Sequence, residues 1–515
     1  MKTQNLMVFA ISLILYINDA SGFCGFYVAK ADATLFNEAS QVIVVRDGNR
    51  TVITMSSDFK GNVKDFAMVV PVPEVLKEEN IRVAERIIFD KLDAYSAPRL
   101  VEYYDDNPCY IDYGYVYDPI TFEEKMEVSE PAQIRAASYG VTIEAQYTIG
   151  EYDILILSAT ESDGLKRWLV DNGYKIPKKA NEVLNPYIKN DMKFFVAKIN
   201  LKEHQKSGFT ELRPLQIAFQ SDKFMLPIRL GMANANGDQD MIVYLFSKEG
   251  RIETANYRTV NLPTDKNIPL FVKDQFGDFY KDMFQRTWNR EGKNVVILEY
   301  AWDISSSNFV KCDPCASTPP AYTDLREAGV FWAQETTPQW GGADYTGDVH
   351  FTRLHVRYNR EKFPQDLFFT ATPNKQSFQG RYILTHPVTG EMDCPEAQNY
   401  LKGVLKRRED ELHQLASLTG WDVSKYSDYV DEFARKIKSK KGGWIEGDFK
   451  NKKNNFYGFG FTNNPGNGNN PSNGVGIILT ISMLFFLILL LSTFLFARKQ
   501  INRRYFGIYL RALRL

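Results

Sequence analysis

Short runs of alternating or continuous apolar residues predict β-strands through most of the chain. Val42–Val45 and Thr51–Met55 flank the turn sequence Asp47-Gly48-Asn49, and this combination predicts a β-hairpin. Phe66–Val70 has the pattern of a buried strand that Pro71-Val72-Pro73 would stop. Further strands are expected at Val141–Tyr147, Ile154–Leu157, Phe194–Leu201, Gln216–Phe219, Met241–Phe246, Val295–Trp302 and Val349–Tyr358.

Helical spacing appears in three segments. Asp163 can cap a helix over Gly164–Asn172, and Lys179–Ile188 predicts a second short helix. The strongest helix signal runs from Pro395 to about Leu418, with an apolar stripe made by Tyr400, Leu401, Val404, Leu405, Leu412 and Leu415. No internal repeat and no regular βαβ alternation is present. The pattern therefore predicts an α+β fold with mixed, mostly antiparallel sheets and interspersed helices.

One apolar run differs from all the others in length. Val475–Ala497 contains 23 residues without a charge, and a helix needs about 20 apolar residues to cross a bilayer. The cations Arg498, Lys499, Arg503 and Arg504 follow it directly. Because positive residues favour the cytoplasmic side, the sequence predicts a single C-terminal transmembrane helix with the preceding chain outside.

The N-terminus has the pattern of a secretory signal peptide over residues 1–22. Lys2 precedes the apolar run Leu6–Ile17, and Ala20-Ser21-Gly22 supplies small residues for cleavage after Gly22. An uncleaved anchor is the alternative, but twelve apolar residues are too few to span a membrane. We expect an α+β ectodomain over residues 23–450, packed as two or three subdomains.

Two segments flank the predicted span. Residues 451–474 are rich in Asn and Gly, which predicts a flexible stalk. Residues 498–515 interleave Arg with Tyr, Phe, Ile and Leu, which predicts a basic amphipathic cytoplasmic tail on the inner leaflet. A cleaved C-terminal sorting signal is the alternative; the tail that runs on to Leu515 favours a retained anchor.

Charge separates these segments from the ectodomain. Seven of the 62 Lys and Arg residues, but one of the 63 Asp and Glu residues, lie in the signal, span and tail, so the part between them carries a net charge of about −7. An acidic ectodomain argues against nucleic acid as a partner. The expected partners are the membrane and an unknown ligand or protein of the cell envelope.

Several long blocks of the chain carry a family resemblance. They are Phe23–Phe59, Asp65–Pro73, Leu92–Tyr104, Ser158–Pro177, Lys311–Cys315, Phe351–Tyr358 and Phe378–Pro387. Together they cover most of Phe23–Trp421, and the chain resembles the bacterial family called domain of unknown function 2330. The resemblance implies an uncharacterised envelope protein with a signal peptide and a C-terminal anchor. It supplies no activity and no catalytic residues.

Five cysteines lie in the predicted ectodomain: Cys24, Cys109, Cys312, Cys315 and Cys394. An oxidising compartment favours disulfides, and an odd number leaves one thiol unless chains pair. We expect a bond between Cys24 and Cys109 and one bond among the other three. A redox dithiol at Cys312 and Cys315 is the sharper hypothesis, because this spacing permits thiol exchange.

A structural bridge is favoured over the redox dithiol. No thioredoxin-like context surrounds the motif, and Cys394 can bond to either of its cysteines. Zinc is a third alternative, for which His386 is the only obvious fourth ligand. We therefore expect neither a metal nor a cofactor.

Two further segments could bind a ligand. Leu100–Glu124 holds six tyrosines, seven carboxylates and no cation. Its Tyr113, Tyr115 and Tyr117, beside Asp and Glu residues, could stack on sugars or coordinate a hard cation such as Ca²⁺ through oxygen. An acidic loop pinned by Cys109, with half-buried tyrosines, is the favoured alternative.

Val349–Tyr358 is the second of these segments. Alternation places Arg353, His355 and Arg357 on one strand face, where they could bind an anion. The favoured alternative is the solvent-exposed face of a half-buried strand.

The sequence lacks the common catalytic signatures. It contains no G-x-S-x-G elbow, P-loop, H-E-x-x-H or dinucleotide-binding fingerprint. We therefore expect a membrane-anchored binding protein rather than an enzyme. The alternative is an envelope thiol–disulfide oxidoreductase that uses Cys312 and Cys315.

Overall fold

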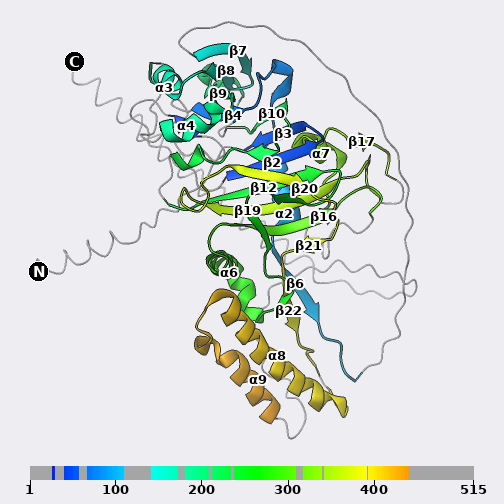
Figure 1. Cartoon of the computed structure of the whole chain (residues 1–515). Helices are drawn as coiled ribbons and strands as arrows, with labels where there is room; N and C mark the ends of the chain where they lie inside the picture. The colour runs from blue at the N-terminus through cyan, green and yellow to red at the C-terminus, as the bar shows by residue number, and fades with distance from the viewer. Residues whose placement is uncertain are drawn as a thin grey trace, which may run out of the picture. The chain divides into compact units, whose positions relative to one another are not determined.

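The computed structural model describes residues 26–28, 40–56, 67–109, 141–171, 180–207, 212–233, 237–308, 317–338, 342–390 and 392–439. Within these ranges the chain has an α+β fold with mixed sheets, as predicted (Figure 1). None of the helices described there is both long enough and apolar enough to cross a membrane. The predicted signal peptide, stalk, transmembrane helix and tail lie outside the described residues.

The largest sheet has nine strands in the order β14–β16–β19–β12–β2–β3–β10–β5, with β21 paired to β16. β12 runs parallel to β2, and β14 runs parallel to β16, whereas the other neighbours in this sheet are antiparallel. Its strands are β2 (Ser40–Asp47), β3 (Arg50–Met55), β5 (Ile81–Val83), β10 (Leu215–Gln220), β12 (Gln239–Ser247), β14 (Arg258–Asn261), β16 (Val295–Asp303), β19 (His350–Tyr358) and β21 (Phe378–Gln379).

Both faces of this sheet are buried, which explains the continuous apolar run of β2. Val42 and Val44 enter one core, while Ile43 and Val45 enter a second core on the opposite face. The second core is covered by α2 (Ile87–Ser96) and α7 (Tyr322–Ala328). The predicted hairpin between β2 and β3 is confirmed, and Gly48 has the positive φ of 53° that its turn needs.

A second, fully antiparallel sheet packs against the first core and has the order β1–β4–β9–β8–β7. The two predicted short helices are confirmed and cover its outer face. The elements are β1 (Phe26–Val28), β4 (Ala67–Val72), β7 (Val141–Ile149), β8 (Tyr152–Ala159), β9 (Lys193–Ile199), α3 (Ser162–Asp171) and α4 (Ala180–Lys189), and α5 (Leu201–Ser207) follows β9.

The prediction that proline stops β4 after Val70 was wrong by two residues. β4 continues through Pro71 to Val72, and Pro71 lies opposite Phe194 of β9. On its other side, β1 pairs only with Ala67–Val69. Within the described residues Pro71 therefore sits where β4 has one neighbour, a position at which a residue without an N–H is tolerated.

A helical layer follows the main sheet, and Figure 1 shows α6 between β19 and α8. It contains α6 (Phe276–Arg290), α8 (Glu396–Thr419) and α9 (Asp428–Ser439). Beside it runs a parallel sheet of β15 (Lys266–Asn267), β22 (Arg381–His386) and β6 (Arg99–Tyr104). Aromatic residues of α6 and Leu415 of α8 share one core with this sheet. α8 confirms the strongest helix prediction, whereas α6 was not predicted.

Two small sheets complete the described strands. They are formed by β11 (Met225–Leu226), β20 (Leu367–Ala371) and β13 (Ile252–Thr254), and by β17 (Gln334–Glu335) with β18 (Tyr345–Thr346).

The disulfide of the described residues joins Cys109 to Cys394, across a sequence separation of 285. The expected Cys24–Cys109 bond is therefore wrong, and so is a bond from Cys394 to Cys312 or Cys315. The parallel pairing of β6 with β22 explains the observed bond. It brings the segments that leave these two strands to the same end of the sheet, where Cys109 and Cys394 meet.

Candidate functional site

The three cations predicted on one strand face do lie together on β19, but carboxylates from other elements surround them. Asp240 of β12 lies directly opposite Arg357. Glu299 of β16 sits at a register shift between Leu298 and Tyr300. Ile297 pairs with His355, so strand alternation places Glu299, two residues further on, on the face that carries Arg353 and His355, and its carboxylate contacts both side chains.

Six side chains form one row of alternating charge, which we call the charge chain: Asp93–Arg353–Glu299–His355–Asp240–Arg357. The five successive nitrogen–oxygen distances are 2.7, 2.6, 2.9, 3.1 and 2.6 Å. Glu299 is fully buried, and Arg353 and His355 are 5% and 8% exposed. The alternative prediction of a solvent-exposed strand face is therefore wrong for Arg353 and His355.

Helix α6 covers the middle of the charge chain. The ring of Phe284 stacks on His355 with centroids 3.9 Å apart, and Arg357 lies over the same phenyl ring. Tyr280 donates its hydroxyl to Glu299, and its oxygen is 3.0 Å from His355 Nδ1. At the outer end, Tyr244 donates to Asp93 at 3.0 Å. Each buried charge thus has partners that offset its desolvation.

Electrostatics favour the protonated form of His355. Burial alone lowers its pKa, but Glu299 and Asp240 outweigh burial and raise the pKa above its usual range. Burial would raise the pKa of Glu299, yet Arg353 and His355 hold it at about 2. With His355 protonated, the charge chain holds three positive and three negative charges. Because both ring nitrogens face carboxylates, His355 has no free nitrogen with which to act as a general base.

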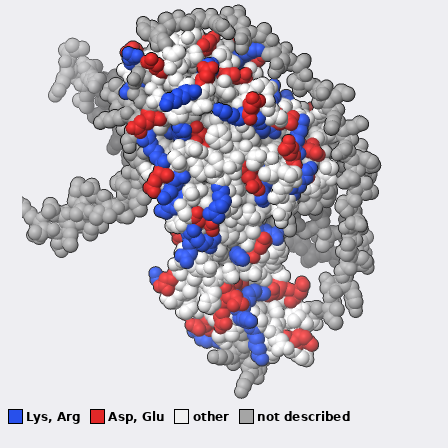
Figure 2. Space-filling model, in the orientation of Figure 1, with Lys and Arg blue, Asp and Glu red and all other residues white. Residues whose placement is uncertain are grey.

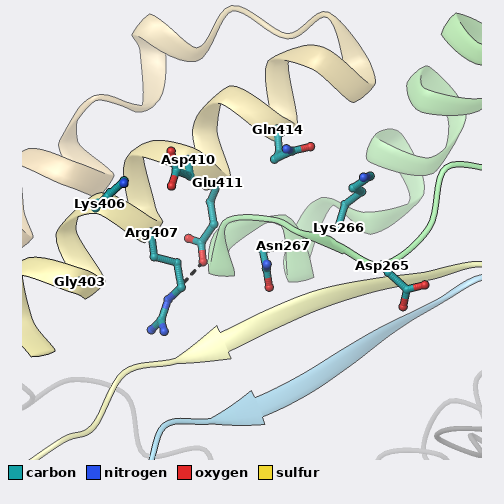
Figure 3. Close-up of a pocket in the computed structure, with 9 residues that line it drawn as sticks. All are labelled: Asp265, Lys266, Asn267, Gly403, Lys406, Arg407, Asp410, Glu411 and Gln414. Atoms are coloured by element: carbon teal, nitrogen blue, oxygen red, sulfur yellow. Dashed lines mark ion pairs between the residues drawn. The ribbon is translucent and has the colours of Figure 1, made fainter.

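A second region of interest is an open hollow along α8, which we call the α8 groove. Its first half, of about 470 Å³, lies between α8 and the segment 265–267 and carries both signs of charge (Figure 3). It is lined by Asp265, Lys266, Asn267, Gly403, Lys406, Arg407, Asp410, Glu411 and Gln414. We call it the mixed half.

The other half lies between α8 and the C-terminal part of α6 and measures about 370 Å³. Its lining, in the part of the chain that the structure describes, includes three cations and no carboxylate, so we call it the cationic half. It is lined by Asn261, Pro263, Lys266, Arg286, Thr287, Arg290, Gln414, Ser417 and Leu418. Lys266 and Gln414 line both halves, which makes the two hollows neighbours along one helix.

Glu411 is the perturbed acid of the α8 groove. Its side chain is 1% exposed and accepts a hydrogen bond of 2.7 Å from Tyr429. Burial raises its pKa to about 7, against the opposing effects of Tyr429 and Arg407. Arg407 is 3.7 Å from Glu411 but makes closer contacts of 3.0 and 2.7 Å with Asp105. Glu411 is therefore largely protonated below about pH 7, unlike an ordinary surface glutamate.

Other predicted site residues divide between described and undescribed parts of the chain. Cys24, Cys312, Cys315, Tyr113, Tyr115 and Tyr117 lie outside the described residues. His386 contacts Glu102 at 2.8 Å and stacks on Tyr104 with centroids 4.5 Å apart. Because Cys394 is in a disulfide, the zinc set that combined it with His386 is wrong. In the described ranges no group of three or more His, Cys, Asp or Glu side chains could hold a metal.

A family model matches residues 18–370, and its description is an uncharacterized protein conserved in bacteria, DUF2330. The chain belongs to the DUF2330 family. No curated protein and no solved structure matches it. The charge chain lies entirely within the residues matched to DUF2330. The α8 wall of the groove lies beyond residue 370. The family model therefore includes the whole charge chain but does not include α8.

Proposed function

We propose that this DUF2330 protein is a single-pass membrane protein that presents its α+β ectodomain outside the cytoplasm and binds a small polar ligand in the α8 groove. The observation that carries the binding proposal is the groove itself. It combines two adjoining hollows, side chains of both charge signs and a buried acid with a raised pKa. Such combinations are typical of binding sites.

The charge chain argues against catalysis at β19, and it favours the α8 groove over β19 as the binding site. Its cations are all engaged by internal carboxylates, and α6 covers the only histidine of the row. A ligand could reach Arg353 or His355 only by displacing buried partners, which costs several kcal/mol. Anion binding at that face therefore stays a prediction of lower rank than binding in the α8 groove.

The distribution of surface charge supports a small ligand rather than nucleic acid. On the face shown in Figure 2, the described Lys and Arg side chains are interspersed with Asp and Glu side chains. Recognition of a nucleic-acid backbone requires a continuous basic surface. The membrane location rests on the uncharged run Val475–Ala497 and the cations after it.

Ligand binding is tested with the full chain in detergent, by thermal-shift screening against a panel of small polar compounds. Gln414 is exposed and lines both halves, so Gln414→Trp should fill the groove and abolish any shift. The matched control is His413→Trp on the exposed side of the same helix, which should keep the shift. A hit that binds equally to both variants would place the ligand elsewhere and contradict the proposal.

Topology is tested separately by treating protoplasts with protease. The ectodomain should be digested, whereas an epitope tag placed after Leu515 should stay protected inside. Protection of the ectodomain, or recovery of the chain in the soluble fraction, would contradict the membrane proposal.

The alternative function, thiol–disulfide exchange, gains support from the Cys109–Cys394 bond. That bond removes the partner with which Cys312 or Cys315 was expected to form a structural bridge. Of the five cysteines, Cys24, Cys312 and Cys315 are left. Alkylation and peptide mass spectrometry with mild reductant test this alternative. It requires a Cys312–Cys315 bond that opens readily and an activity that Cys312→Ser loses.

A further inference from the structure

We infer that the cationic half of the α8 groove binds an oxyanion, the carboxylate or phosphate group of a small ligand; this inference rests on the proposed function and names its ligand class. The side chains that would bind the anion are Lys266, Arg286 and Arg290. They come from three separate positions in the fold, which are β15 and two successive turns of α6.

These cations are poorly neutralised by the protein. In the described part of the chain, Lys266 makes no side-chain hydrogen bond or ion pair, and Arg286 contacts no carboxylate. Arg290 lies 3.5 Å from Glu291, but Glu291 also pairs with Arg258 at 3.0 Å. Among the described residues, no carboxylate lines this half of the groove. The hollow therefore has an excess of positive charge that an anion would offset.

The position of Arg286 is fixed by the end of α8. Its Nε donates a 2.9 Å hydrogen bond to the carbonyl of Ser417, which leaves its terminal nitrogens for a ligand. Gly420 ends α8 with a φ of 81°, and a Cβ at that position would lie 2.9 Å from Arg286 Nη1. A side chain here would be strained by the backbone and would crowd the guanidinium. The helix end thus holds Arg286 in place, and a guanidinium held in this way recognises oxyanions well.

The mixed half does not offer an equivalent site for a cation. Asp265 is 2.5 Å from Arg381, and Glu411 is largely protonated below about pH 7. Asp410 is thus the one described lining carboxylate of this half that makes no ion pair within the described residues. Lys266 and Lys406 flank the same hollow. Both halves therefore favour a ligand with an anionic group at the cationic end.

The neutral lining adds groups that can complete an anion's hydrogen bonds. Asn261 and Gln414 carry amide donors, and Thr287 carries a hydroxyl group. Carboxylates and phosphates share the need for several donors around one charge. The geometry does not separate these two oxyanions, so the experiment treats them as two arms.

The test uses calorimetric titration of the full chain in detergent with inorganic phosphate and, separately, with citrate at matched ionic strength. We expect saturable binding of at least one probe. Lys266→Gln should raise its Kd about tenfold, as expected for one lost charge-assisted contact. Lys402→Gln removes the same charge from an exposed position of α8 outside the groove, and it should leave the Kd unchanged.

Each outcome is decisive. Binding of phosphate alone assigns a phosphate ligand, binding of citrate alone assigns a carboxylate ligand, and either supports the inference if Lys266→Gln weakens it. No saturable binding, or equal binding to both lysine variants, overturns the inference. If a neutral or cationic compound from the screen is lost in Gln414→Trp while both oxyanions fail, the groove function stands and the oxyanion inference alone falls.

Discussion

The charge chain and the α8 groove contain similar charged residues, but these residues have different roles in the two regions. In the charge chain, Glu299, Arg353 and His355 are buried, and all six charged side chains are paired along a continuous row. In the cationic half of the groove, lysine and arginine side chains line open space, and no carboxylate stands among the described lining residues. Burial forces charges to pair, whereas exposure lets them stay unpaired at little cost. Pairing therefore separates structural charges from charges available to a ligand.

The same contrast explains two perturbed acids. Glu299 and Glu411 are both almost completely buried, yet the pKa of Glu299 falls to about 2 while that of Glu411 rises to about 7. Arg353 and His355 contact Glu299 directly, whereas Arg407 is committed to Asp105. Burial raises the pKa of both carboxyl groups, and the proximity of cations decides the outcome.

The strongest way to break the charge chain is Glu299→Gln. It leaves Arg353 and His355 buried with one carboxylate fewer, and we expect a loss of about 3–5 kcal/mol in the free energy of unfolding. Chemical denaturation of the full chain in detergent measures the change. The control Glu361→Gln removes an exposed carboxylate and should leave stability nearly unchanged. Equal small effects of both substitutions would show that the chain is not a structural unit.

The next largest effect is expected for the disulfide that ties the groove region to β6. Cys109→Ser with Cys394→Ser should lower the free energy of unfolding by about 2–4 kcal/mol, because the bond constrains a long loop of the unfolded chain. Thermal unfolding with and without reductant measures the loss. Reductant should destabilise the wild type to the level of the double variant. Cys312→Ser with Cys315→Ser, by contrast, should retain the Cys109–Cys394 bond in peptide mapping.

Titration of Glu411 should make the free energy of unfolding depend on pH. The pKa of its carboxyl group is about 4.5 in the unfolded chain and about 7 in the folded protein, so the folded state binds the extra proton between these values. Stability therefore falls as pH rises from about 4.5 through about 7, by up to roughly 3 kcal/mol. Glu411→Gln should lack this loss and should be the more stable variant above about pH 7.

The comparison of wild type with Glu411→Gln also controls for other titrating groups. His355 contributes a loss of the same sign, because its pKa is raised and stability falls as pH rises from 6.5 through that higher value. This loss is common to both proteins and cancels in the difference. The ionisable groups around Glu411 are also the same in both proteins; they are Asp105, Arg407, Arg408 and Tyr429. A difference between the two proteins that does not vary with pH would contradict the raised pKa.

Local patterns predicted the β2–β3 hairpin, α8 and the shared face of Arg353, His355 and Arg357. Partners distant in sequence could not be predicted in the same way. Glu299 contacts Arg353 and His355 because β16 pairs with β19, and the sequence of β16 alone does not show which strand lies beside it. Cys109 meets Cys394 because β6 pairs with β22, a contact that no local pattern encodes.

One residue of the groove did leave a signal in the sequence. Glu411 is seven residues after Val404 and four before Leu415, so it falls on the apolar stripe of α8. A carboxylate at such a position is expected to be buried and perturbed. Helix α6 left a weaker signal, because its aromatic residues are interleaved with charged ones and Gly277 lies in its first turn.

The smallest expected effect is also the sharpest test of the contrast between the two regions. Lys266→Gln should change the free energy of unfolding by less than about 0.5 kcal/mol, because this lysine has no ion pair to lose within the described residues. The substitution also removes the repulsion of Lys266 by Arg286 and Arg290, so any change in the free energy of unfolding should be stabilising. Denaturation at low and high salt checks both points, since salt screens the repulsion. A large destabilisation would mean that Lys266 is a structural charge like Arg353. Lys266 would then not be available to bind an anion in the cationic half.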